Sequence, residues 1–92
     1  MNLPDAVFDQ RLTPHELAVY AFLCRTAGSS RHCWPALTTI AQMCRMKRDT
    51  AIDAIRGLAD RCMVERQKRF SDSVMYTLTL PEQWRQKSRN GD

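Results

Sequence analysis

The amino-acid sequence predicts a mainly helical α+β fold, in which three helices precede an antiparallel β-hairpin. Three observations predict it. Apolar residues repeat with helical spacing in three separate segments. Two β-prone runs follow them, joined by turn-forming residues at 70–73. The chain has 92 residues, of which 43% are hydrophobic, so we expect one modest core rather than two domains.

The first helix is predicted from its own start signal. Thr13 can cap it, Pro14 suits the first helical position, and Glu16 can complete a capping box. The Gly-Ser-Ser segment at 28–30 is expected to end it, and residues 32–34 fit a short strand. Its apolar surface is wide enough that other segments must cover both flanks. That surface consists of Leu17, Val19, Tyr20, Ala21, Phe22, Leu23, Cys24 and Ala27.

Two short amphipathic helices come next, separated by about three residues. In each, apolar residues recur at i, i+3, i+4 and i+7. The two sets are Leu37, Ile40, Ala41 and Cys44, and then Ala51, Ala54, Ile55 and Leu58. This pattern is typical of a helix-turn-helix, whose second helix, here about 47–61, can lie in the DNA major groove.

The hairpin is predicted from runs at 63–69 and 74–80. In the second run one alternating set of side chains is expected to pack on the helices, namely Val74, Tyr76, Leu78 and Leu80. A helix-turn-helix followed by a hairpin is a winged helix. We therefore divide the chain into an N-terminal arm (1–12), the winged helix-turn-helix domain (13–80, wing at 63–80) and a polar segment or linker start (81–92). We expect Trp84 to pack this last segment against the domain.

All of the net charge of +4 falls within residues 45–69. This segment holds 8 basic residues (Lys or Arg) and 4 acidic residues (Asp or Glu). The residues before it hold 3 basic and 3 acidic residues, and so do the residues after it. The rest of the chain is balanced, so the sequence predicts one basic face, built around the third helix, with double-stranded DNA as its partner.

Several classes of protein are excluded. The longest apolar stretch, 17–24, is far shorter than the ~20 residues of a membrane span, and the N-terminus does not follow the plan of a signal peptide. We expect a cytoplasmic, nucleoid-associated protein that has no membrane partner. The four cysteines form no C-x-x-C pair, and we find no nucleophile elbow, phosphate loop or paired carboxylates. We therefore expect no enzymatic activity, catalytic residue, metal, cofactor or small-molecule ligand.

Several motifs together resemble a known family. They are Cys33-Trp34-Pro35, Thr39-Ile40-Ala41, 46–51 (MKRDTA), Ile55, Leu58, Val64-Glu65-Arg66 and Tyr76-Thr77-Leu78. The chain from about 12 to 80 resembles the winged helix-turn-helix domains of plasmid, phage and conjugative-element proteins. These include replication initiators, replisome organisers and small transcriptional regulators, so the resemblance implies DNA binding and leaves the biological process open.

The sequence departs from the family pattern at three positions. Arg45 stands where the family has a turn glycine, and Cys62 where it has glycine after the recognition helix. Both sites are expected to need a positive φ. Ala36 stands where a serine usually caps the second helix, which removes a cap worth about 1 kcal/mol.

The outer side of the third helix supplies candidate base contacts. Arg48, Ile52 and Arg56 form a row at i, i+4 and i+8. Arg48 can donate twice to a guanine edge, and Ile52 can touch a thymine methyl. Asp49 and Asp53 can accept from a cytosine amino group or hold an arginine, for example Asp53 with Arg56. The acidic pair argues for base recognition over binding by charge alone.

Backbone contacts are expected on both sides of this row. Lys47 lies near the start of the helix and can meet a phosphate. Thr50 suits a phosphate contact or a buried or capping role. Arg66, Lys68 and Arg69 would hold the neighbouring backbone or minor groove, which predicts an affinity that falls steeply with salt. A dimer or tandem domains on repeated half-sites would add specificity.

Other interpretations stay open at this point. A helix face of mixed charge can be a solvated surface, and cations on a strand can protect its edge. Trp34 and Tyr76 are assigned to the core rather than to base stacking, because both sit in apolar patterns. The main alternative function is a protein-interaction module on the same scaffold, and a degenerate domain with weak activity is another.

Overall fold

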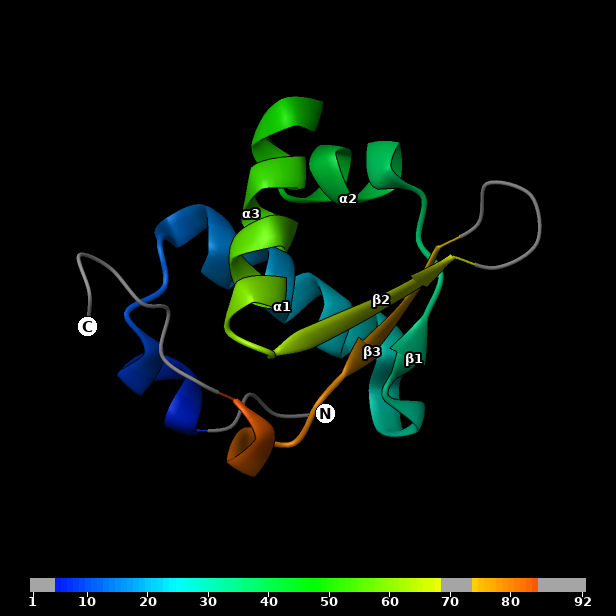
Figure 1. Ribbon diagram of the computed structural model, residues 1–92. Coiled ribbons are helices and arrows are strands. Elements are labelled where there is room, and N and C mark those ends of the chain that lie inside the picture. The colour runs from blue at the N-terminus through cyan, green and yellow to red at the C-terminus, as the bar shows by residue number, and fades with distance from the viewer. Residues whose placement is uncertain (1–4, 69–73, 85–92) are drawn as a thin grey trace.

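The computed structural model describes residues 5–68 and 74–84. It contains α1 (Pro14–Ala27), β1 (His32–Cys33), α2 (Leu37–Met43), α3 (Arg48–Asp60), β2 (Val64–Lys68) and β3 (Val74–Leu78). Three short 3-10 helices complete it, η1 (Asp5–Gln10), η2 (Gly28–Ser30) and η3 (Pro81–Gln83). Figure 1 shows α2 and α3 packed together at one end, while β2 runs from the end of α3 across the molecule. This is the predicted winged-helix α+β fold.

The start and end of α1 are as predicted. The Glu16 amide donates to Thr13 Oγ1 over 3.1 Å, and the Thr13 amide donates to Glu16 Oε1 over 3.0 Å, which completes the capping box. The helix ends before Gly28, whose φ of 59° lies in the region that favours glycine. The Gly28 amide donates to the Cys24 carbonyl.

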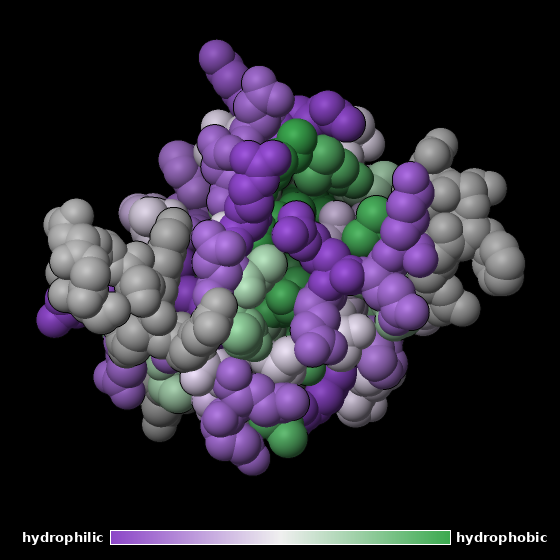
Figure 2. All heavy atoms as spheres, in the orientation of Figure 1, coloured by the Kyte–Doolittle hydropathy of each residue, from purple (hydrophilic) through white to green (hydrophobic). Residues whose placement is uncertain are grey.

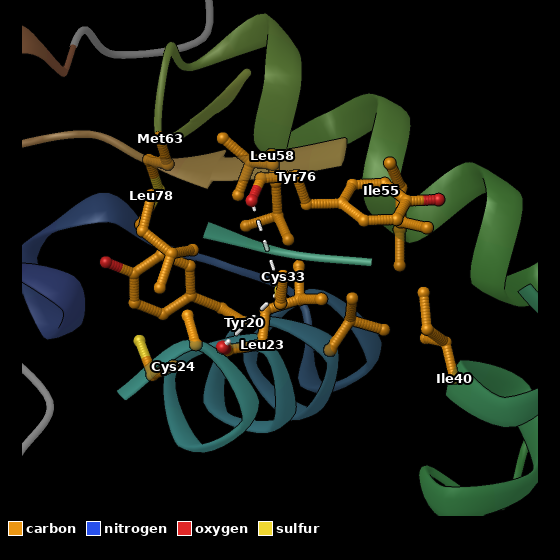
Figure 3. Close-up of a cluster of buried hydrophobic side chains, with 14 of the residues drawn as sticks. Tyr20, Leu23, Cys24, Cys33, Ile40, Ile55, Leu58, Met63, Tyr76 and Leu78 are labelled. Carbon is orange, nitrogen blue, oxygen red and sulfur yellow. Dashed lines mark hydrogen bonds between the residues drawn. The ribbon is translucent and has the colours of Figure 1, made fainter. Parts of the chain in front are cut away.

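The core lies between α1, α3 and the sheet. Figure 3 shows Tyr20 and Leu23 of α1 pointing toward side chains of α3 and β3. The Cys33 thiol lies between these layers, with its Sγ 3.9 Å from the Leu23 carbonyl oxygen and 4.0 Å from that of Tyr76. The buried apolar residues include Val19, Tyr20, Leu23, Ile40, Ala51, Ile55, Leu58, Met63, Tyr76 and Leu78. The wide apolar surface of α1 is thus covered from more than one side.

Trp84 is attached to the domain, as predicted. Its ring meets Tyr20 edge to face, with the centroids 5.8 Å apart and the planes at 88°. Its indole N–H donates to the Thr79 carbonyl over 3.3 Å. Val7 of η1 is also fully buried in the core. Segments from both ends of the described chain therefore pack on the helical core.

The three strands form an antiparallel sheet in the order β1-β3-β2. In β2 and β3, Val64 pairs with Leu78 and Arg66 with Tyr76. Because directly paired residues share a face, Arg66 lies on the same side of the sheet as the buried Tyr76. The expected turn at 70–73 lies outside the described residues, as does the segment from 85 onward.

Two assignments of apolar residues were wrong. Trp34, expected in the core, is 53% exposed, because it follows the buried Cys33 and side chains alternate between the faces of a strand. Leu80, expected on the buried face, is 37% exposed, since β3 ends at Leu78 and Leu80 leads into η3. The Leu80 amide donates to Gln83 Oε1 over 2.8 Å, outside the sheet. Tyr76 is buried as predicted.

The buried thiols should be chemically inert in the native protein. Burial, with a smaller effect of neighbouring Cys24, raises the pKa of the Cys33 thiol from 9.0 to about 11. Burial also raises the pKa of Cys24. We expect iodoacetamide at pH 8 to alkylate Cys33 about 100-fold more slowly in native than in urea-unfolded protein, because only the thiolate reacts. Peptide mass spectrometry measures both rates, and equal rates would contradict the burial of Cys33.

The same shift makes stability depend on pH. The folded state holds the Cys33 proton up to about pH 11, whereas the unfolded thiol loses it near pH 9. The buried, protonated Cys33 thiol therefore makes its full contribution to the free energy of unfolding below pH 9. That contribution is lost as the pH rises from 9 to 11.

Candidate nucleic-acid interface

Helix α3 presents its predicted charged residues to solvent. Ala51, Ala54, Ile55 and Leu58 are buried against the rest of the domain, as expected. The opposite side carries Arg48, Asp49, Asp53 and Arg56, all exposed, together with the half-buried Ile52. Figure 2 shows hydrophilic side chains across this view of the molecule, with apolar atoms visible between them. The surface of α3 can therefore offer hydrogen-bond donors, acceptors and one apolar side chain.

Asp53 and Arg56 form the ion pair suggested by their spacing. Arg56 Nη1 lies 3.9 Å from Asp53 Oδ1, and both side chains are well exposed. An exposed pair at this distance adds little stability. The guanidinium of Arg56 thus lies beside the Asp53 carboxylate on the surface of α3.

The first turn of α3 combines a basic side chain with an uncapped helix end. Lys47 occupies the N-cap position and its side chain makes no capping hydrogen bond. Lys47 is exposed and Thr50 is half-buried. Since Lys47 holds the cap position, Thr50 does not cap the helix.

The described wing cations lie on an edge strand. Arg66 and Lys68 are exposed on β2, which has one neighbour, β3, in the sheet of described residues. Burial raises the pKa of Tyr76, and the charge of the adjacent Arg66 opposes that rise. Arg69, the third predicted wing contact, lies outside the described residues. The structure thus places Arg66 and Lys68 on the surface without showing that they share a site with α3.

One cation of the basic segment does not belong to the surface. Arg61 is buried, and its Nη1 lies 3.0 Å from Glu16 Oε1 and 3.2 Å from the Gly57 carbonyl oxygen. The basic face therefore has one exposed cation fewer than the charge count predicted. The sequence offered no signal for this pairing, because Glu16 and Arg61 are 45 positions apart.

Arg45 and Cys62 both adopt the left-handed conformation, with φ values of 56° and 60°. Arg11 and Arg31 are the other non-glycine residues with positive φ in the described chain. The Arg45 and Met46 amides donate back to Gln42 and Ala41, a Schellman motif that ends α2. Cys62 occupies the same position after α3. A non-glycine residue costs about 1–2 kcal/mol there, so both departures from the family pattern carry strain.

Ala36 is the N-cap of α2 and makes no side-chain capping bond, as expected from its lack of a hydroxyl.

An open hollow of about 590 Å³ lies beside the turn between α2 and α3. The hollow lies between the first turn of α1 and the start of α3. Its lining consists of His15, Ala41, Gln42, Arg45, Met46, Lys47 and Thr50. His15 and Arg45 were not among the predicted contacts. The sequence provided a reason to consider Arg45, because a bulky cation stands where glycine suits the backbone. It provided no reason to consider His15 as a contact.

Within residues 5–68 and 74–84, no three His, Cys, Asp or Glu side chains cluster so as to hold a metal ion. No helix in the same ranges is long and apolar enough to cross a membrane.

Comparison with known proteins agrees with the geometry. A family model described as a helix-turn-helix domain matches residues 10–64. The match spans α1, β1, α2 and α3 and reaches the first residue of β2. A search of the curated proteins found no match. The matched segment contains both the exposed surface of α3 and the hollow beside it.

Proposed function

Because the chain belongs to this helix-turn-helix domain family, we propose that it binds double-stranded DNA in a sequence-specific way, with α3 in the major groove. One observation carries the proposal. The side of α3 opposite the core exposes two arginines, two aspartates and a half-buried isoleucine. Together these side chains supply the donors, acceptors and apolar group that base edges in the major groove require.

Each of these side chains suits a base edge. Arg48 and Arg56 can donate to O6 and N7 of guanine, and Ile52 can contact a thymine methyl. Asp49 can accept from a cytosine amino group, and Asp53 steadies Arg56 through their ion pair. The carboxylates would repel phosphates, so they favour contact with bases over binding by charge alone.

Backbone contacts supply the remaining affinity. Lys47, the N-cap residue of α3, and Thr50 in its first turn would contact a phosphate beside the groove. Arg66 and Lys68 on β2, with Arg69 beyond it, serve as wing contacts to the neighbouring backbone.

The process served is either transcriptional regulation or origin binding by a mobile-element replication protein. A single small module buries only about 600–1,000 Å² on DNA, so a homodimer or tandem domains would improve specificity. Selection of bound duplexes from a random pool separates the two arrangements. An inverted repeat supports a two-fold dimer, while direct repeats support tandem binding at an origin.

The base contacts are tested by Arg48→Ala and Arg56→Ala. Each substitution is expected to weaken binding to the selected duplex by about 1–3 kcal/mol and to relax preference at one base position. Fluorescence anisotropy measures the Kd, and repeated selection measures the preference. Arg25→Ala, which removes an exposed cation from the last turn of α1, is the matched control. If both variants bind like Arg25→Ala, α3 does not contact the bases.

The wing contacts predict a different signature. Arg66→Gln and Lys68→Gln should weaken all duplexes alike, and each should lower the slope of log K against log salt by about 1. Titration at several salt concentrations measures this slope. An unchanged slope would assign these cations to protection of the β2 edge.

A second candidate function is docking of a protein partner. The observation that favours it is exposed apolar surface, with Phe8 67% exposed in η1 and Trp34 exposed after β1. A chain that selects no duplex but pulls down a partner, and loses it in Phe8→Ser, would support this function instead.

A further inference from the structure

We propose that the hollow beside the turn between α2 and α3 holds a phosphate of the DNA backbone, with Arg45, His15 and Lys47 as its contacts. This inference rests on the proposed function and extends it, because Arg45 and His15 lie outside both α3 and the wing. The ligand is a phosphodiester oxyanion, and its source is the DNA strand beside the groove that α3 enters.

The chemistry of the lining suits an oxyanion. Arg45 and Lys47 are positively charged, and His15 adds a ring N–H. Gln42 and Thr50 add an amide and a hydroxyl, the neutral donors that commonly contact phosphates. No carboxylate is among the residues that line the hollow. The donors come from α1, from α2 and the turn after it, and from the start of α3, so three elements border this open hollow.

The backbone of Arg45 makes the proposed contact testable. Arg45 has a φ of 56° at a position that suits glycine, so its side chain is kept at a cost in stability. Cys62 has nearly the same φ, 60°, after α3, but it does not line the hollow. The two residues therefore form a matched pair for experiment.

The hollow also lies in the right place for this ligand. Lys47, the N-cap of α3, and Thr50 in its first turn both line the hollow. With α3 in the major groove, the backbone that borders the groove would pass beside this turn. Base contacts on α3 and a phosphate in the hollow would then fix the register of the helix on DNA.

The first test compares Arg45→Gly with Cys62→Gly. Both relieve a left-handed backbone, so both should raise the Tm by a few degrees. Arg45→Gly should also weaken binding to a duplex of unselected sequence about five- to tenfold near 0.1 M salt, and lower the salt slope by about 1. Cys62→Gly should bind as the wild type does. Thermal unfolding and anisotropy titrations measure these effects.

The second test leaves the turn unchanged. His15→Glu places a carboxylate at the hollow, in the first turn of α1, where an acidic residue favours the helix. It should weaken duplex binding at least fivefold without lowering the Tm. Thr26→Glu makes the same change of charge on the exposed surface at the other end of α1 and should have a much smaller effect.

The outcomes separate this inference from the proposed function. If Arg45→Gly and His15→Glu bind like their controls while Arg48→Ala loses affinity, the hollow holds no phosphate and the proposed function stands. If the wild type binds no duplex, the phosphate site and the proposed DNA-binding function are both wrong. Titration with inorganic phosphate, monitored by NMR chemical shifts, tests whether the hollow binds a free phosphate ion instead of a DNA phosphodiester. Saturable phosphate binding that both variants abolish, with duplex affinity unchanged, would assign the hollow to a free anion and overturn its role on DNA.

Discussion

Gly57→Ala is expected to lower the free energy of unfolding by about 3 kcal/mol, although alanine is the better helix former by about 1 kcal/mol. A Cβ at this position would lie 1.8 Å from Glu16 Oε2 and 2.8 Å from its carboxyl carbon. The Glu16 carboxylate cannot easily move, because it is buried and held by the Thr13 amide and by Arg61, each over 3.0 Å. The added methyl group must therefore displace the carboxylate and separate it from Arg61.

Urea unfolding measures this loss, which corresponds to a fall in Tm on the order of 15 °C. Gly28→Ala is the matched control, since nothing lies within 4 Å of a Cβ there and only backbone strain is added. Repeating Gly57→Ala in a Glu16→Ala background should remove most of its cost, because the clash is gone. An equal cost in both backgrounds would show that Glu16 does not lie against Gly57.

Glu16→Leu is expected to destabilise the fold by about 3–5 kcal/mol, because it leaves the guanidinium of Arg61 buried without its anion. Arg61 Nε has no hydrogen-bond partner among the described residues, so the loss of Glu16 would leave Arg61 with only the Gly57 carbonyl as a partner at Nη1. Adding Arg61→Met to Glu16→Leu should recover most of the loss, because an apolar pair of similar volume can fill the same space.

Thr13→Ala separates the capping box from the ion pair. It removes the Thr13 hydroxyl that accepts from the Glu16 amide, at a cost of about 1 kcal/mol, and leaves Arg61 paired. Urea unfolding of the wild type and of these three variants completes the comparison. If Glu16→Leu were no less stable than Thr13→Ala, the contact between α1 and α3 would not depend on this ion pair.

The ion pair connects the start of α1 to the end of α3. Arg61 follows the last residue of α3, and Glu16 lies in the first turn of α1. The pair therefore helps to set how α3 is held against the domain that presents it. His15, the residue before Glu16 in the same first turn, lines the hollow.

Local features were predicted well. The capping box at Thr13, the end of α1 before Gly28 and the buried stripe of α3 all follow from residues within a few positions of one another. The positive φ at Arg45 was expected from the family resemblance, which places a turn glycine at this position. The first three features depend on hydrogen bonds or periodicity inside one element, which the sequence displays directly.

Errors arose where one element ends and another begins. Trp34 and Leu80 both continued an apolar pattern, yet both are exposed. The pattern could not reveal that strand β3 ends at Leu78, or that Trp34 is left exposed after β1. Side-chain alternation shows that two residues share a face, but not whether anything packs on it.

The sequence by itself determined the order of the elements, the helix-turn-helix and the charged outer side of α3, since periodicity and capping act over short distances along the chain. Only the tertiary structure decided which charges remain at the surface. It buries Arg61 against Glu16 and brings His15 to Arg45 across about one third of the chain. The physical reason is that the burial of a charge, or its convergence with others, depends on what packs beside it in space.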